Sequence, residues 1–356
     1  MDVKNASGNI IFCCTSVSSF VAKDIQILTH AGYTVTPLLF IWHPKWRLPV
    51  TFLKQFCQLF YYLFTNRMII VQFGGMHAFL PVIMAKIWRK PSLVILGGTD
   101  CAKFPSIAYG NFNKKILGWF TAQSVKHAMH LAPKHASLMW FDYTYDSSDY
   151  PAQGIQCFAL NLKTPFTIIE NGYDATVFKR VCDKKQHTFL TVAAGIELPN
   201  TMALKGIDLI LKVAPHFSHC TFTIVGVPTD FNLPVQLKNV VVLPQQNAAQ
   251  LIQLYSMHTF YMQLSMSEGF PNAICEAMLC ECIPIGSNVN AIPDIIGNTG
   301  YLLQHRDIGL LTHLVTKAIN DVTENRGINA RQRIAENFSI AQRSQKLLTL
   351  VQKLLP

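Results

Sequence analysis

The residues best suited to chemistry lie in the run SMSEGFPNAICEAMLCECIPIG, at residues 265–286. An apolar strand ends just before this run, and Pro271 predicts the start of a helix, because proline lacks the N–H that a first helical residue leaves unpaired. The amides of Asn272, Ala273 and Ile274 would then point outward from the positive end of the helix. Such amides bind anions, so the loop is a candidate anion site.

Two carboxylates flank this anion site. Glu268 lies in the loop before the helix, and Glu276 lies inside the helix, about one turn beyond the free amides. A carboxylate accepts hydrogen bonds from a pair of sugar hydroxyls, so an anion held between two such acceptors indicates a nucleotide sugar. Taken alone, the two glutamates would equally fit stabilisation of the helix dipole, an effect of about 0.3 to 1 kcal/mol each.

The run resembles the EX7E signature of the retaining glycosyltransferases of family 4, with seven residues between Glu268 and Glu276. Further segments resemble the same family in the same order along the chain. They are the hinge segment IENGYD at 169–174 with Phe178, the segment LKGID at 204–208, the strand at 222–226 that ends in Val-Gly, and the donor-side segments at 283–286, 290–294 and 300–303. The resemblance covers nearly the whole carboxyl-terminal half and, more thinly, the amino-terminal half.

This resemblance implies an α/β protein of the GT-B fold, in which two Rossmann-like domains with parallel sheets face each other across a cleft. It implies sugar transfer from a nucleotide-diphosphate sugar with retention of anomeric configuration, with no metal and no further cofactor required. Lys205 would neutralise the donor diphosphate, Glu268 would contact the transferred sugar, and Glu276 would hold the ribose hydroxyls. The remaining donor-binding positions would be Gly195, Gly269, Phe270, Pro271, Asn272, Ala273 and Ile274.

One position departs from the family pattern. The family usually has an Arg after the first strand of the second domain, whereas here Gly195 is followed by Ile196. No Arg occurs between Arg180 and Arg306. Neutralisation of the diphosphate would then depend on Lys205, the helix amides and a further basic residue.

Two glycine-rich turns of the amino-terminal half are acceptor-side candidates. In the run GGTD, Gly98 would let the backbone approach a sugar, and Asp100 would accept from an acceptor hydroxyl. The family commonly has His at the position of Gly97. After the preceding strand, Gly75 and His77 are candidates for the same cleft, and His77 is equally consistent with a structural role. No residue is assigned as a general base.

Short apolar runs followed by helical patterns recur in both halves and indicate repeated β-α-β units. The strand runs are continuously apolar, which is typical of parallel strands covered by helices on both faces. A weakly periodic stretch near residues 150–185 predicts the hinge. The predicted organisation is an acceptor-side domain at 1–165, a nucleotide-sugar-binding domain at 166–335, and a helix at 336–356 that Ser339 caps and that packs back toward the amino-terminal domain.

Length and charge narrow the function further. The chain has 356 residues, half of them hydrophobic, which suits two folded domains and excludes disorder. Residues 1–150 contain 14 Lys and Arg against 6 Asp, a charge of +8, whereas residues 151–356 contain 16 against 14 acidic residues, a charge of +2. A basic half can bind nucleic acid, anionic lipid or a phosphorylated substrate. Without a recognised motif or a dense Lys/Arg run, nucleic-acid binding is not expected.

The apolar stretch at residues 48–64 has two interpretations. Lys54 and two glutamines interrupt it, so it does not span a bilayer. It could lie in a membrane interface, because Trp42, Lys45, Trp46 and Arg47 precede it and such surfaces bind aromatic rings and cations. The alternative, which we favour at this stage, is a buried helix with a few polar residues at its edge.

Cysteine usage and the amino terminus indicate the compartment. The 10 cysteines show neither CxxC spacing nor a zinc-type cluster with His, so we expect reduced core residues. The amino terminus lacks the hydrophobic region of a signal peptide. We expect a cytoplasmic protein, with peripheral attachment to the inner face of the cytoplasmic membrane if the interface interpretation holds.

The resemblance leads to a specific hypothesis: the acceptor is a glycan or lipid-linked glycan, in polysaccharide or glycolipid biosynthesis. Two alternatives remain open. A nucleotide-sugar epimerase shares the fold and a donor cleft but lacks this arrangement of glutamates. An inactive sugar-nucleotide-binding or scaffold protein would fit the missing Arg.

Overall fold

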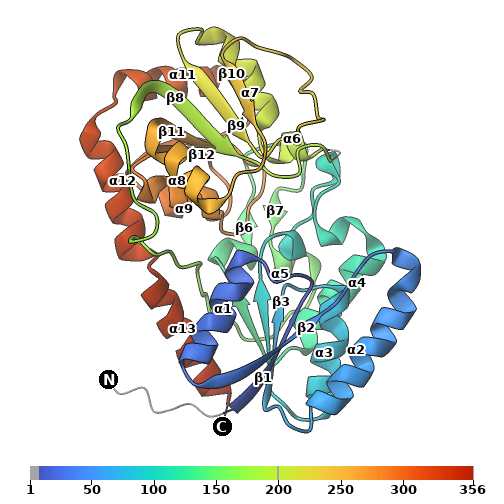
Figure 1. Cartoon of the computed structure of the whole chain (residues 1–356). Helices are drawn as coiled ribbons and strands as arrows, with labels where there is room; N and C mark the ends of the chain where they lie inside the picture. The colour runs from blue at the N-terminus through green and yellow to red at the C-terminus, as the bar shows by residue number, and fades with distance from the viewer. Residues whose placement is uncertain (1–7, 199, 356) are drawn as a thin grey trace.

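The computed structural model describes residues 8–198 and 200–355, which form two α/β domains stacked one above the other (Figure 1). The prediction that the amino terminus lacks a signal peptide concerns a segment that begins with residues 1–7, and these residues lie outside the described range. Within the described residues, no helix is both long enough and apolar enough to cross a membrane.

The amino-terminal domain is built on a 5-stranded parallel sheet in the order β2-β1-β3-β4-β5. The strands are β1 (Gly8–Cys14), β2 (Tyr33–Leu39), β3 (Met68–Gln72), β4 (Ser92–Leu96) and β5 (His130–Pro133). The helices are α1 (Ser19–His30), α2 (Leu48–Tyr62), α3 (Met76–Ile87), α4 (Lys115–His127) and α5 (Ile155–Phe158). Strand β2 contains Pro37, which its position at the edge of the sheet tolerates.

The carboxyl-terminal domain contains a 6-stranded sheet in the order β10-β9-β8-β11-β12-β13, with every described pairing parallel. Its strands are β8 (Lys185–Val192), β9 (Thr221–Val225), β10 (Val240–Leu243), β11 (His258–Gln263), β12 (Ile283–Ser287) and β13 (Tyr301–Leu303). Its helices are α6 (Thr201–Leu204), α7 (Ile207–Val213), α8 (Ala248–Met257), α9 (Asn272–Leu279), α10 (Ile292–Ile296) and α11 (Ile308–Asn320). Phe189 stacks between Phe222 and Phe260 of its two neighbouring strands, with ring centroids 4.8 and 4.7 Å apart.

The strand and helix pattern confirms the predicted fold of two Rossmann-like domains. A short antiparallel pair, β6 (Phe141–Asp142) and β7 (Ala152–Gln153), precedes the segment that joins the two domains.

The chain returns to the amino-terminal domain through α12 (Glu324–Asn337) and α13 (Ile340–Leu354), which run down one side of the molecule (Figure 1). Ser339 forms a capping box with Gln342 at the start of α13, which confirms the predicted cap. Arg343 of α13 forms a buried ion pair with Asp24 of α1, with Nη2 and Oδ2 2.6 Å apart. Leu347 and Val351 of α13 pack into the same core cluster as β1 and β3. The last helix therefore belongs to the amino-terminal core.

Helix α2 contradicts the buried-helix interpretation. Its buried residues are Gln55 and Leu59, whereas most of its other large side chains are exposed. Cys57 lies on the exposed side, so the expectation that all cysteines are core residues is also wrong at this position. The sequence pattern was misleading because an apolar helix predicts burial only where another surface covers it.

Candidate active site

The site forms where β11 ends and the chain runs through residues 264–271 into α9. Three donors converge on Oε1 of Glu268: Nζ of Lys205 at 2.6 Å, Oγ of Ser265 at 2.9 Å and Nε2 of Gln263 at 3.2 Å. The backbone amide of Glu268 donates to Oδ1 of Asn290 at 3.0 Å. These bonds fix the carboxylate in one orientation and leave Oε2 available as an acceptor for a substrate hydroxyl.

Gly206 brings Lys205 to Glu268. Lys205 ends α6, and Gly206 precedes α7 in a left-handed conformation with φ of 69°. A Cβ at Gly206 would lie 2.2 Å from the carbonyl oxygen of Leu264, so only glycine allows this approach. The amide of Met266 also donates to the carbonyl of Leu204 at 2.8 Å. Lys205 and Gly206 are therefore held against the end of β11.

Helix α9 begins at Asn272, one residue later than predicted, and Pro271 is its N-cap residue without a side-chain cap. As the first residues of α9, Asn272, Ala273 and Ile274 carry the amides that a helix leaves without intrahelical carbonyl partners. They retain the geometry of an anion site at the positive end of the helix dipole.

The hinge segment anchors the beginning of α9. Nδ2 of Asn171 donates to the carbonyl of Phe270 at 3.1 Å and to Oδ1 of Asn272 at 2.9 Å. The hydroxyl of Tyr173 donates to the same Oδ1 at 2.8 Å. The NGY motif that the sequence placed at the hinge thus positions the donor-side loop, a role that sequence reasoning missed.

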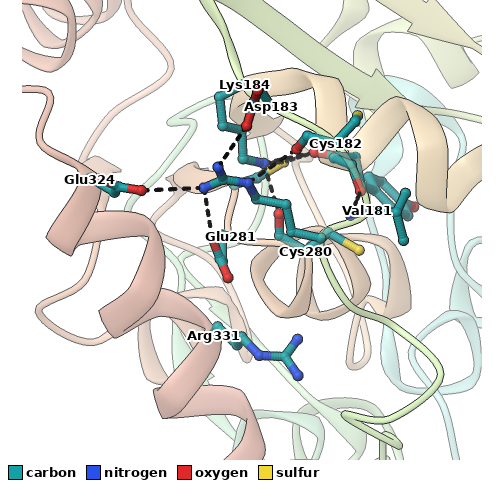
Figure 2. A network of polar contacts seen from close by, with 12 residues as sticks. Val181, Cys182, Asp183, Lys184, Cys280, Glu281, Glu324 and Arg331 are labelled. Atoms are coloured by element: carbon teal, nitrogen blue, oxygen red, sulfur yellow. Dashed lines mark hydrogen bonds and ion pairs between the residues drawn. The ribbon is translucent and has the colours of Figure 1, made fainter.

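Cationic side chains bind the opposite end of α9 (Figure 2). Nζ of Lys184 donates to the carbonyl of Cys280 at 2.7 Å, and Arg331 donates to the carbonyl of Leu279. Positive charge at a helix carboxyl terminus stabilises the dipole. The neighbouring Arg180 bonds Glu281 at 3.1 Å, so the linker after the hinge is held against the same helix.

Glu276 lies half-buried on α9. Burial raises the pKa of this carboxyl from 4.5 to about 7, and the charge of Lys23 and a hydrogen bond with Tyr255 oppose that rise. Of the predicted donor-binding residues, Gly269 lines the cavity that contains Glu268, and the others do not: Gly195, Phe270, Pro271, Asn272, Ala273, Ile274 and Glu276. The two glutamates therefore lie in different places: Glu268 lines the cavity, and Glu276 lies on α9 outside it.

Asp100 joins the two glycine turns of the amino-terminal domain. Its Oδ2 accepts from the amide of Gly74 at 2.8 Å, and its Oδ1 accepts from the amides of Gly97 at 3.0 Å and Gly98 at 2.9 Å. Asp100 is only 2% exposed. It positions these turns, so the structure favours this role over the expected direct contact with an acceptor hydroxyl.

The two domains meet at Gly269, the residue that follows Glu268. A Cβ on Gly269 would lie 1.3 Å from the carbonyl oxygen of Gly97, and a Cβ on Gly98 would lie 2.9 Å from the amide nitrogen of Gly269. Across the same interface, Nε2 of His135 lies 2.8 Å from Oδ2 of Asp294. These contacts close the cleft.

A cavity of about 420 Å³ lies between the closed domains. Lys205, Glu268 and Gly269 line it from the carboxyl-terminal domain; the lining residues of the other domain include Trp42, Gly75, His77, Gly98, Asp100, Tyr109, Asn111 and Leu117. The cavity thus brings the two predicted catalytic residues together with all four acceptor-side candidates. Sequence reasoning missed Trp42, Tyr109 and Asn111 at this site, because no motif marks them.

His77 is buried, at 4% exposed, and its two ring nitrogens differ. Nε2 lies 2.8 Å from the carbonyl oxygen of Gln72, so Nε2 carries the proton in this bond. Nδ1 is then an acceptor, and it has no partner among the described residues. Burial lowers the pKa of His77, which favours this neutral form. This nitrogen is itself buried, so His77 lines the cavity without presenting Nδ1 to it.

The carboxyl-terminal domain, which contributes Lys205 and Glu268, is similar in sequence to known proteins. Residues 191–321 match the family model described as Glycosyl transferases group 1. N-acetyl-alpha-D-glucosaminyl L-malate synthase of Bacillus anthracis is 31% identical over 125 residues, which are 33% of this chain and 30% of that protein. Capsular polysaccharide biosynthesis glycosyltransferase CapM of Staphylococcus aureus is 29% identical over 115 residues, 31% of this chain and 30% of that protein. These matches thus span less than a third of either relative.

Similar solved structures superpose on nearly the whole chain. Sucrose-phosphate synthase from Thermosynechococcus elongatus superposes with a TM-score of 0.73 at 14% identity, over 98% of this chain and 99% of that chain. Anabaena Alr3699/HepE in complex with UDP-glucose superposes with a TM-score of 0.67 at 14% identity, over 97% of this chain and 100% of that chain. The protein has a GT-B fold, and its carboxyl-terminal domain carries the sequence match to Glycosyl transferases group 1.

Proposed function

We propose that the protein is a retaining glycosyltransferase that moves a sugar from a nucleotide-diphosphate sugar to a glycan or lipid-linked glycan acceptor. The observation that carries this proposal is the fixed pair of Lys205 and Glu268 in the interdomain cavity, where the loop after β11 leads into α9. The sequence match to Glycosyl transferases group 1 and the similarity to the capsular polysaccharide biosynthesis glycosyltransferase CapM support transfer in polysaccharide biosynthesis. The complex of Alr3699/HepE with UDP-glucose supports a nucleotide-sugar donor.

The donor side would stabilise the leaving group. Cleavage of a glycosyl phosphate bond develops negative charge on the diphosphate, so a fixed ammonium and helix amides stabilise the transition state more than the ground state. Lys205 and the start of α9 would supply this charge without a metal ion. Oε2 of Glu268 would accept from hydroxyls of the transferred sugar, and Glu276 would hold the ribose hydroxyls.

The acceptor would enter from the amino-terminal side of the cavity. The lining residues on that side include Gly75, His77 and Gly98. Asp100 would keep the glycine turns in place so that backbone can approach the acceptor sugar.

The first test is a thermal-shift screen against nucleoside diphosphates and their sugars. A ligand at about 100 times its dissociation constant stabilises the protein by roughly 2.7 kcal/mol, which such a screen detects. The donor that it identifies is then incubated with candidate glycans, and the anomeric configuration of the product is read by NMR. We expect retention, loss of transfer in Glu268→Gln, and no loss in the exposed control Glu336→Gln.

Three outcomes would contradict the proposal. Epimerisation of the donor without an acceptor would identify an epimerase. Donor binding without turnover on any glycan acceptor would identify a binding or scaffold protein. Inverted configuration in the product would remove the retaining mechanism while leaving sugar transfer.

A further inference from the structure

Helix α2 presents its apolar side to solvent. Leu53 is 64% exposed and Phe64, just after the helix, is 67% exposed, whereas the polar Gln55 is only 5% exposed. Nε2 of Gln55 donates to the carbonyl of His77 at 2.9 Å, so this polar side chain forms part of the contact with the domain. The outer side of this helix is therefore mainly apolar, unlike that of an ordinary surface helix.

The exposed apolar surface continues over the neighbouring helices. Phe60 of α2 contacts Trp88 at the end of α3, with ring centroids 5.7 Å apart. Helices α2, α3 and α4 share one core cluster, and α1 and α13 share another, so the first three cover one face of the sheet (Figure 1). We name this surface the α2–α4 face; its exposed residues are Val50, Leu53, Phe56, Phe60, Tyr61, Phe64, Ile87, Ile116 and Trp119.

The part of the chain that carries this apolar surface is rich in positive charge. Between residues 25 and 141 the chain contains 12 Lys and Arg and one acidic residue, Asp100. Asp100 is buried, so this segment exposes no carboxylate. Arg47 and Lys54 are exposed beside the α2–α4 face, and the Arg47 guanidinium lies 4.8 Å from the ring of Trp46.

An anionic bilayer fits this combination of features. Aromatic and aliphatic side chains enter the boundary between headgroups and acyl chains, and basic residues around them bind anionic lipid. A second copy of this chain would bring the same positive charge to the same surface, which opposes self-association through it. We propose that the α2–α4 face docks the protein on an anionic phospholipid bilayer.

The α2–α4 face borders the cavity. Trp42, which precedes α2, and Leu117, which follows the exposed Ile116 in α4, both line it. The ring of Trp42 contacts that of His77, with centroids 6.0 Å apart. A lipid-linked acceptor could therefore remain in the bilayer while its headgroup reaches the cavity. This last step rests on the proposed function, whereas docking itself does not.

The structure changes the residues that sequence reasoning assigned to this surface. Trp46 is 72% exposed and Lys54 is exposed, in agreement with the interface interpretation. Trp42 instead lines the cavity, and the side chain of Lys45 lies outside the described part of the structure. Most of the apolar contact comes from α2 itself.

Sedimentation with vesicles tests the docking. The full chain is mixed with vesicles of phosphatidylcholine alone or with added phosphatidylglycerol, at low and high salt, without donor or acceptor. We expect the protein to pellet with the anionic vesicles and salt to weaken this binding. Each charge reversal, Arg47→Glu or Lys54→Glu, should lower the partition coefficient at least fivefold, because a basic residue near such a surface contributes about 1 kcal/mol.

Apolar variants and matched controls complete the test. Leu53→Gln and Phe64→Gln should each lower partitioning roughly fivefold, because burial of such side chains contributes about 1 kcal/mol or more. Leu310→Gln and Lys238→Glu change exposed residues of the other domain and should partition as wild type. Equal thermal melts would show that all variants are folded.

Specific results would overturn the docking proposal. Wild type that stays in the supernatant with anionic vesicles would do so, as would Leu53→Gln and Lys54→Glu variants that bind as well as wild type. A wild-type dimer that Leu53→Gln converts to monomer, without vesicle binding, would assign the face to a second copy. Because no nucleotide is present, these results are independent of the donor-binding screen.

Discussion

The substitution Glu276→Gln tests whether a buried carboxylate is held on α9 for a ligand. Glutamine has nearly the shape of the glutamate side chain and resembles its protonated form. In the folded protein, burial raises the pKa of Glu276 from 4.5 to about 7. The folded state therefore binds more protons than the unfolded state between these values, and the wild-type protein loses stability as the pH rises through this window.

The magnitude follows from the two pKa values. A change from 4.5 to about 7 corresponds to roughly 3 kcal/mol in the free energy of unfolding, an upper value because the side chain is partly exposed. Glu276→Gln lacks this titration, so its stability relative to wild type should increase between pH 5 and pH 8. Urea denaturation at a series of pH values measures this difference, with Glu336→Gln on the exposed surface of α12 as control.

Nucleotide binding should show the opposite preference. In the proposed role the ionised carboxylate would accept from both ribose hydroxyls, so calorimetric titration with the preferred nucleoside diphosphate should show tighter binding to wild type as the pH rises through about 7. Glu276→Gln should bind more weakly and without that dependence. If the stability difference between the two proteins stayed constant from pH 5 to pH 8, and their affinities for nucleotide were equal, Glu276 would be neither strained nor functional.

Three further predictions concern catalysis, closure and the last helix. Lys205→Met should lower kcat by about 100-fold and weaken donor binding less, because charge on the diphosphate grows toward the transition state; equal effects on both constants would argue against this. Gly269→Ala should abolish transfer yet preserve nucleotide-dependent thermal shifts, because its Cβ would clash with the facing turn of the other domain. Asp24→Asn should cost about 3 to 5 kcal/mol in urea denaturation, because it leaves the Arg343 charge buried and unpaired, whereas Glu170→Gln at an exposed pair should cost under about 1 kcal/mol; similar costs would refute the burial argument.

Features encoded within one continuous segment could be predicted from the sequence. The run from Glu268 to Glu276 contains a strand end, a loop and a helix start, so its local spacing was sufficient to predict the free amides and the flanking carboxylates. The continuous apolar strands likewise predicted two parallel sheets, because both faces of such strands are covered. Ser339 was predicted to cap the last helix by its position before a periodic segment, and the structure has that capping box.

Features that depend on distant segments were decided by the tertiary structure. Asp100 follows a glycine turn, which suggested contact with a ligand, but its carboxylate also reaches the amide of Gly74 and is occupied by backbone. The tautomer of His77 depends on a bond that its ring makes to Gln72. Closure of the cleft brings Gly97 against Gly269, two residues that no local pattern connects.

Helix α2 shows the physical reason for this division. Its residues determine that the segment is helical and apolar, and this was evident from the sequence. Whether such a helix is buried depends on what other parts of the chain pack over it. The same apolar residue can be buried or exposed, so the sequence of the helix does not decide between the two. In this fold α2 packs on the domain through Gln55 and Leu59, and nothing in the described chain covers its opposite side. The sequence alone determined an apolar helix, and only the arrangement of the domain decided that its apolar side faces outward.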